Sequence, residues 1–215
     1  MKASFLILVL ILWGARGVTQ APVVKSETQT YSSDVGFSYT LPADWEVVDM
    51  SAALKAEQER TNGGAAGEQE KRGVGCLQIA MTAHHGAPAS MIVAMALPAS
   101  CVGLQMSEKD LPGFGTGAWQ GMQQQFDVGE PVEAAYSLGS HRAWAARLAA
   151  TLKDDSHRPF TLETVCALLK KGAVCWMTLA ADNDALTTFE QGLATLDGET
   201  PVPLVPKNTF PKGHS

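Results

Sequence analysis

His84 and His85 are adjacent in the sequence and could in principle bind a metal ion or carry a proton. They follow an alternating run that ends at Thr82 and precede an apolar run, so the sequence places them in a turn between two strands. Neighbouring side chains of an extended backbone point to opposite faces, so two adjacent imidazoles rarely bind the same ion. We therefore expect a polar turn that is able to contact a partner, without a bound metal.

His141 and His157 each stand in a Ser-His-Arg triplet, near the ends of two neighbouring predicted strands. Strand ends that meet would bring the triplets together as a shared anion site, whereas two surface turns would keep them apart; we favour the turns. His141 beside Asp154 or Asp155 would instead pair a base with a carboxylate in a cleft, as a small hydrolase or ligand-binding enzyme requires. This enzyme is the alternative interpretation of the chain.

The four cysteines are an even number and permit two disulfide bonds. Cys166 and Cys175 lie on the arms of a hairpin predicted around "LLKKGA". If Lys170 and Lys171 form the centre of the turn, the two cysteines lie directly opposite each other. If Lys171 and Gly172 form it, the cysteines lie on the same face of the hairpin, and Cys166 is two residues away from the position opposite Cys175. Cys76 and Cys101 form the second expected pair, which only the fold can bring together. Buried free thiols packed as small apolar groups are the alternative.

Other motifs with a known chemistry are incomplete. The stretch "GFGTG" at 113–117 lacks the preceding strand of a dinucleotide loop and the Lys-Ser/Thr of a P-loop. The sequence contains neither a Gly-x-Ser-x-Gly elbow nor a Cys-x-x-Cys pair. Met91, Met95 and Met106 carry thioethers that suit copper, but core filling explains them better. We assign no catalytic residue, no metal and no cofactor.

The elements that must position these residues are mostly strands. Alternating residues at 37–41 and 45–47 predict a pair of short strands or one kinked strand, interrupted by Pro42. Further strands are predicted at 77–82, 89–97, 130–138, 141–152, 160–169 and 173–181.

Two firm helices are predicted beside these strands. The first spans roughly 115–126, where Trp119, Met122 and Phe126 share a face and glycines weaken the preceding turn. The second spans 183–196 and is capped by Asp182. Its apolar stripe consists of Leu186, Phe189, Leu193 and Leu196.

The N-terminus has the order of a secretory signal peptide. Lys2 precedes the nine apolar residues 5–13, which are too few to span a bilayer core of about 20 residues. Small residues at Ala15 and Gly17 favour cleavage after Gly17. A buried strand or helix is the alternative. No later segment approaches 18 uncharged apolar residues, so we expect a secreted or periplasmic protein without stable membrane insertion.

The rest of the chain is divided into three parts. Residues 18–35 are a polar leader, 36–197 a single domain, and 198–215 a proline-rich flexible tail. Removal of the signal peptide leaves 14 basic and 22 acidic residues, a net charge of −8. This balance argues against nucleic acid as a partner, because phosphate contacts need a basic surface.

The phrase "GFSYTLPADWEVVD" resembles the first hairpin of the PsbP-like families, whose members often start "GF-f-lP-gW". The later order is similar: two central strands, a helix, the strands "HRAWAARLAATL … FTLETVCALLKKGAVCWMTLAA", and a closing amphipathic helix. The resemblance covers about residues 31–197. It implies an α+β fold, an α/β/α sandwich around an antiparallel sheet, in the secreted bacterial branch of a group that also holds photosystem lumen subunits and a Ran-binding nuclear protein.

Most members of that group are binding or assembly modules without a catalytic site. The resemblance therefore implies a non-enzymatic module with a protein partner in the cell envelope or outside the cell. The insertion at 51–72 and the four cysteines depart from the family pattern. We expect the contact surface at this insertion and at the turn near His84.

Overall fold

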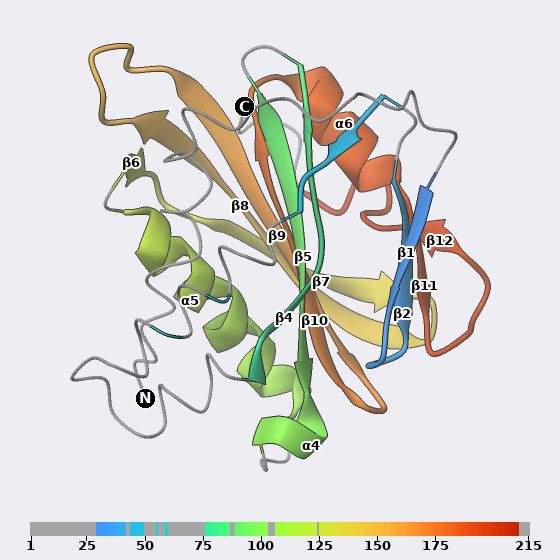
Figure 1. The fold of residues 1–215 in the computed structure, drawn as a ribbon. Helices are drawn as coiled ribbons and strands as arrows, with labels where there is room; N and C mark the ends of the chain where they lie inside the picture. Colours follow the sequence, from blue (N-terminus) through green and yellow to red (C-terminus); the bar gives the residue numbers. More distant parts are fainter. Residues whose placement is uncertain are drawn as a thin grey trace.

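The computed structural model shows an α+β protein built mainly of antiparallel strands with few helices (Figure 1). The residues that the structure describes are 29–41, 44–49, 55, 59, 76–86, 89–102, 106–123 and 125–210. The predicted signal peptide at 1–17 lies outside the described residues, as does the insertion at 51–72 apart from residues 55 and 59.

The larger sheet runs through the middle of the molecule. Its strands are, in spatial order, β3 (Glu46–Val47), β4 (Gln78–His85), β5 (Ser90–Pro98), β10 (Gly172–Ala180), β9 (Pro159–Leu169), β8 (His141–Leu152) and β6 (Phe126–Val128). β7 (Val132–Leu138) also pairs with β8, beside β6. Every residue of β10 is buried, as expected for a central strand covered on both faces.

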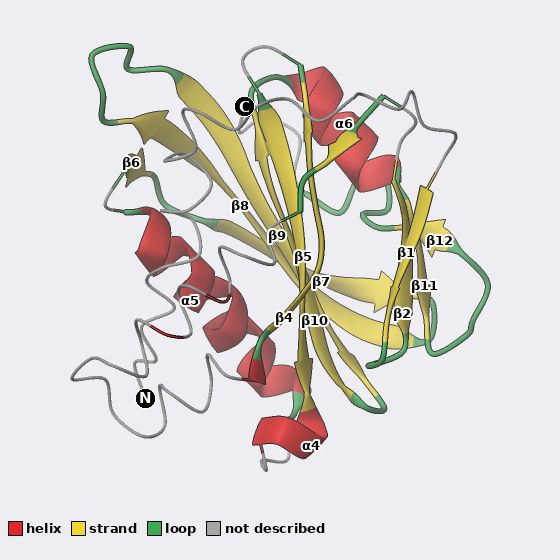
Figure 2. Ribbon diagram, in the orientation of Figure 1, coloured by secondary structure: helices red, strands yellow, loops and turns green. Residues whose placement is uncertain are grey.

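A smaller sheet packs on one face of the larger one (Figure 2). Its order is β1 (Gln29–Ser33), β2 (Phe37–Leu41), β11 (Leu193–Leu196) and β12 (Val202–Pro203). Phe37, Tyr39 and Leu41 point inward, which confirms the predicted alternation of this strand. However, β2 and β3 belong to different sheets, so the opening stretch does not form a hairpin with itself.

Helices cover parts of both faces of the larger sheet. α5 (Leu111–Met122) packs on one face through Leu111, Phe114 and Trp119. α6 (Asn183–Gln191) shares the other face with the smaller sheet, and Phe189 is fully buried there. Two further short helical segments are α4 (Ala99–Val102) and the 3₁₀ turn η1 (Glu108–Asp110). The expected sandwich of helices around a sheet is therefore present in part.

The predicted helix at 183–196 is wrong in its second half. Asp182 caps its start as predicted, accepting a hydrogen bond from the Ala185 N–H at 2.8 Å. The helix ends at Gln191, and residues 193–196 form β11 instead. Leu193 is 44% exposed while Leu196 is buried, so the apparent four-leucine stripe is divided between two elements.

Gly192 explains why the chain turns at this point. A Cβ atom at this position would lie 2.0 Å from the hydroxyl of Tyr39. Glycine therefore lets β2 pack against the end of α6, where the Tyr39 hydroxyl donates to the Phe189 carbonyl at 3.1 Å. A tertiary contact thus ends the helix.

The helix predicted at 115–126 begins and ends four residues earlier. Its glycines do not break it, because the ring of Trp144 fills the space where a Cβ of Gly115 would lie, at 2.2 Å. Phe126 belongs to β6 and is buried next to Phe160, 5.9 Å between ring centroids. The close approach of helix and sheet outweighs the low helix propensity of glycine.

The predicted flexible tail is also wrong as far as residue 210. Residues 202–203 form β12, and the buried side chains of Leu204, Val205 and Phe210 join the core shared with α6. The domain therefore extends beyond its predicted end at 197. The prolines in this segment restrict the backbone, while its apolar side chains supply the contacts that a disordered tail lacks.

Both expected cysteine pairs lie at disulfide distance. Cys166 and Cys175 are direct cross-strand partners, with Cα atoms 4.1 Å apart. Their turn is the one centred on Lys170 and Lys171, because Leu169 pairs with Gly172. The Cα atoms of Cys76 and Cys101 lie 5.6 Å apart. The second pair joins the residue before β4 to α4.

Candidate functional site

Several turns of the two sheets meet at one end of the molecule. We call this the hairpin-tip end and define it as residues 34–36, 139–141, 170–171 and 197–199. The β1–β2 turn and the β9–β10 turn lie near each other at the lower right of Figure 1. Two hydrogen bonds join the turns: the Asp197 N–H donates to the Gly36 carbonyl at 2.7 Å, and the Lys170 N–H donates to the side-chain carboxylate of Asp197 at 3.1 Å.

His141 sits among these turns with both ring nitrogens in contact. Nδ1 lies 3.0 Å from the carbonyl oxygen of Leu168, so it must be the protonated nitrogen that donates. Nε2 lies 3.5 Å from a carboxylate oxygen of Asp197 and 3.5 Å from one of Glu199.

Ser140 next to it is bound to Glu199. Its N–H donates to one carboxylate oxygen at 2.9 Å, and its hydroxyl donates to the other. These hydrogen bonds, with smaller contributions from His141 and Lys170, lower the pKa of Glu199. Because the hydroxyl donates to a carboxylate rather than to the imidazole, these residues do not form a serine–histidine nucleophile pair.

A pocket of about 530 Å³ opens at the same end. It is lined by Asp34, Val35, Gln78, Pro98, Ala99, Ser100, Lys170 and Lys171. The lining includes two lysines and one aspartate, in a protein whose overall charge is negative. The pocket can therefore accept an acidic or hydrogen-bonding group of a ligand.

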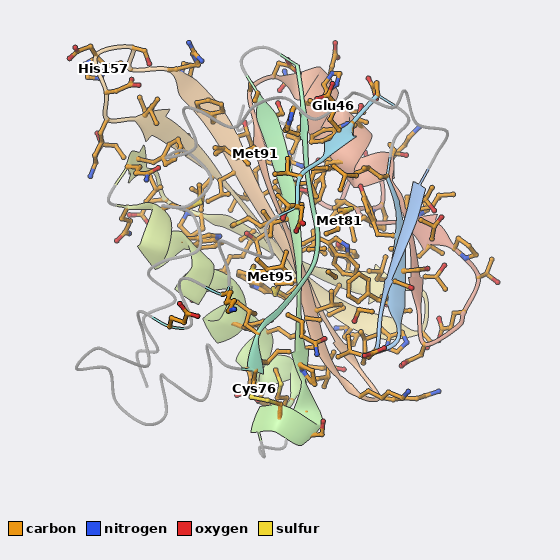
Figure 3. All side chains as sticks on the ribbon, viewed as in Figure 1. Glu46, Cys76, Met81, Met91, Met95 and His157 are labelled. Carbon is orange, nitrogen blue, oxygen red and sulfur yellow. A yellow bond between two sulfur atoms is a disulfide. The ribbon has the colours of Figure 1, made fainter. Side chains whose placement is uncertain are left out.

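The walls of this pocket are held by bonds between distant parts of the chain. The Ala99 N–H donates to the Lys171 carbonyl at 2.9 Å and ties the β9–β10 turn to α4. The Cys76–Cys101 pair stands next to Ser100 and two residues before Gln78, so it joins two walls. Figure 3 shows Cys76 beside α4. The sequence predicted this cysteine pair but not the pocket beside it.

His84 and His85 lie at the opposite end of β4 from Gln78. His84 Nε2 is 3.5 Å from a carboxylate oxygen of Glu46. The His85 ring stacks on Trp45, and its Nδ1 is 3.5 Å from a carboxylate oxygen of Asp44. The two imidazoles thus contact different side chains, and the described part of the chain holds no group of three His, Cys, Asp or Glu side chains suited to a metal.

His157 is exposed in the turn after β8 (Figure 3). His141 is the first residue of that strand. β8 has 12 residues and is about 36 Å long at 3.3 Å per residue. The possible shared anion site of His141 and His157 is therefore wrong. The same separation excludes His141 acting with Asp154 or Asp155, because both acids lie in the turn with His157.

The sequence analysis missed a buried charged cluster on the α6 side of the larger sheet. Arg147 of β8 binds Glu163 of β9, with Nε 2.6 Å from a carboxylate oxygen, and also binds Glu190 of α6. The Phe210 ring covers the guanidinium, 4.2 Å from Cζ to the ring centroid. The signal in the sequence is one charged residue within each of two apolar strands, "AWAARLAA" and "FTLETVCA".

Glu163 is completely buried, and this burial raises its pKa to about 7. The neighbouring Glu190 carboxyl adds to the rise, and Arg147 opposes it. Burial likewise raises the pKa of Glu190. The Glu163 oxygen that faces away from Arg147, Oε1, has no donor in the described structure, so a proton shared between the two carboxyl groups would satisfy it.

Comparisons with known proteins give little beyond this geometry. No family model matches the chain. No curated protein matches it either. Among solved structures, the chain is similar to the solution structure of cyanobacterial PsbP (CyanoP) from Synechocystis sp. PCC 6803. That similarity has 13% sequence identity and a TM-score of 0.43, and it covers 80% of this chain and 90% of that chain. A match at this level assigns neither a family nor an activity to the chain.

Proposed function

We propose that the chain is an extracytoplasmic, non-enzymatic binding module of PsbP-like fold that holds a protein partner at the hairpin-tip end. The observation that carries the proposal is the pocket lined by Lys170, Lys171 and Ser100, on a frame fixed by backbone bonds and by the Cys76–Cys101 pair. The preferred partner segment has an acidic side chain or a free carboxylate that meets the two ammonium groups.

The extracytoplasmic location is supported by two separate features. The first 17 residues have the order of a signal peptide. Two cysteine pairs at disulfide distance are typical of proteins that fold in an oxidising compartment. Among the described residues, no helix is long and apolar enough to cross a membrane.

A binding role also agrees with how the polar groups at this end are used. The Ser140 hydroxyl, the His141 ring and the carboxylates of Asp197 and Glu199 bond to one another and to the backbone. They fix four turns relative to each other, which gives a partner a rigid surface. Rigid surfaces lose little conformational entropy on binding.

Site-specific photo-cross-linking in extracts of the cell envelope tests the proposal. A photoreactive residue at the exposed position 100, in the pocket, should give one adduct of defined mass. The same residue at the exposed position 158, at the far end of β8, should not. Lys170→Ala with Lys171→Ala should abolish the adduct at position 100, because it removes both ammonium groups.

A charge-matched control is Lys153→Ala with Arg158→Ala, which removes two positive charges near the far end of β8 and should leave the adduct intact. An adduct that survives the Lys170 and Lys171 substitutions would refute the pocket as the contact site. Deletion of residues 61–72 tests the other proposed contact surface, the insertion with the His84 turn. If the deletion abolishes the adduct and the Lys170 and Lys171 substitutions do not, the binding site lies at the insertion and the His84 turn.

A further inference from the structure

Residues 197–210 run along the side of the domain, from the hairpin-tip end to the charged cluster beneath α6. We call this segment the C-terminal strap. It includes β12, which pairs with β11 through Leu193–Pro203 and Ala194–Val202. In its second half, the Leu204 N–H donates to the Gly192 carbonyl and the Val205 N–H to the Glu190 carbonyl, each at 2.9 Å.

Ionisable groups hold the strap at its first end. Asp197 and Glu199 of the strap face His141 of β8, each at 3.5 Å from Nε2. Lys170 of the β9–β10 turn also holds the strap here, because its N–H donates to the Asp197 carboxylate.

Ionisable groups also hold the strap at its second end. The Phe210 ring rests on the Arg147 guanidinium, which is fixed by Glu163 and Glu190. Tyr136 of β7 is a further titratable group near this cluster, and its hydroxyl donates to the Leu204 carbonyl at 2.8 Å. Burial and the two nearby glutamates raise the pKa of Tyr136, so it stays a donor throughout the physiological range.

The charge of this second cluster depends on a single proton. With one proton on the pair Glu163 and Glu190, the two carboxyl groups and Arg147 sum to zero. Without it, the cluster carries one uncompensated negative charge next to a carboxyl group that is completely buried. Because a buried unpaired charge is costly, the deprotonated cluster favours any motion that lets water reach it. The strap lies over the cluster through Phe210, so its release would admit water.

We propose that the C-terminal strap is a proton-dependent clasp: it is closed when the Glu163–Glu190 pair holds its shared proton and loosens when that proton is lost. The end at Phe210 is the one that responds, while the contacts of Asp197 and Glu199 hold the first end of the strap. The clasp does not depend on the binding function proposed above.

Amide hydrogen exchange of the full-length protein tests the clasp. The readout is the protection factors of the Leu204 and Val205 amides, which already correct for the intrinsic pH dependence of exchange. Burial raises the pKa of Glu163 to about 7, so the closed strap binds a proton that the open strap releases. These protection factors should therefore fall at least about tenfold between about pH 5 and about pH 8, while amides of β10 stay protected.

Glu163→Gln keeps the shape of the side chain and cannot ionise, so it should remove most of this fall. Glu190→Gln tests the other member of the pair and should reduce the fall in the same direction. Glu130→Gln, at an exposed position outside the cluster, is the matched control and should leave the fall unchanged. Protection at Leu204 and Val205 that does not change with pH in the wild type would overturn the clasp, as would the same fall in the wild type and in both glutamine variants.

Discussion

At the scale of single residues, Glu163 is a side chain that should make the stability of the protein depend on pH. The group is completely buried, and its pKa is raised from 4.5 to about 7. Between these values the folded protein holds a proton that the unfolded chain has lost. The free energy of unfolding should therefore decrease as pH rises from about 4.5 to about 7, and the contribution of Glu163 should be flat above that range.

The expected loss over this range is about 3 kcal/mol, because one pKa unit corresponds to about 1.4 kcal/mol. Urea unfolding at several pH values measures it, and the difference between wild type and Glu163→Gln isolates it from other groups. Glu199, whose pKa is lowered, contributes the opposite slope at more acid pH and cancels in the difference. A difference between the two proteins that does not vary with pH would place the Glu163 carboxyl in contact with water.

Replacing Arg147 alone should lower the free energy of unfolding much more than replacing it together with its partner Glu163. Arg147→Leu leaves Glu163 and Glu190 without their counter-charge, and breaking a buried pair in this way costs about 3 to 5 kcal/mol. Arg147→Leu with Glu163→Leu removes both buried charges and should recover most of that loss. Chemical unfolding near neutral pH gives both values. If the double variant were the less stable of the two, the cluster would have to be held by other bonds.

The residues that the sequence alone could predict are those whose partner is set by local geometry. Cys166 and Cys175 face each other because side chains alternate across a short hairpin, and that follows from spacing. His141 and Asp197 meet only after four turns converge, and Arg147, Glu163 and Glu190 come from three elements. A contact between distant segments has no local pattern, so only an unusual charge within an apolar strand signals it.

At the scale of elements, alternation and periodicity predicted most strands but not where two of the helices end. α6 ends where Gly192 gives room to Tyr39, which lies on β2 of the smaller sheet. α5 tolerates its glycines because one of them lies against Trp144. In both cases the deciding contact is tertiary, and a pattern read along the chain cannot contain it.

The glycines of α5 provide a matched pair of substitutions. A Cβ at Gly115 would lie 2.2 Å from the Trp144 ring, whereas a Cβ at Gly113 would meet nothing within 4 Å. Gly115→Ala should therefore destabilise the protein by about 1 to 3 kcal/mol through overpacking, despite the better helix propensity of alanine. Gly113→Ala should stabilise it by about 0.5 to 1 kcal/mol, because it gains only the propensity. Thermal or urea unfolding of the two variants measures both, and equal effects would show that α5 does not approach the sheet so closely.

At the scale of the whole molecule, the pairing of strands into two sheets was beyond the sequence analysis. Alternation shows that a segment is a strand, but not which strand lies beside it. Thus β2 and β3, only a few residues apart, belong to different sheets, and β11 inserts between β2 and β12 from the far end of the chain. The sequence analysis also missed the strap. Its prolines are typical of a disordered tail, although its side chains Leu204, Val205 and Phe210 are buried in the core.

The two cysteine pairs constrain the whole chain to different extents. Cys76 and Cys101 are 25 residues apart in sequence, and Cys166 and Cys175 are 9 apart. In the chain-entropy description, a cross-link that closes a longer loop removes more freedom from the unfolded state. The expected contributions are about 3.5 kcal/mol for the first pair and about 2.5 kcal/mol for the second.

Measuring each cross-link requires a chain that keeps only that pair. Cys166→Ala with Cys175→Ala leaves the longer loop closed, and Cys76→Ala with Cys101→Ala leaves the shorter one. Each variant is unfolded by urea to equilibrium with and without reductant, so the difference reports the cross-link and not the substitution. The reductant should cost the first variant about 1 kcal/mol more than the second. Non-reducing peptide mapping of the wild-type protein first verifies the two pairings. An equal or reversed effect of the reductant would mean that native contacts rather than loop length set the stabilisation.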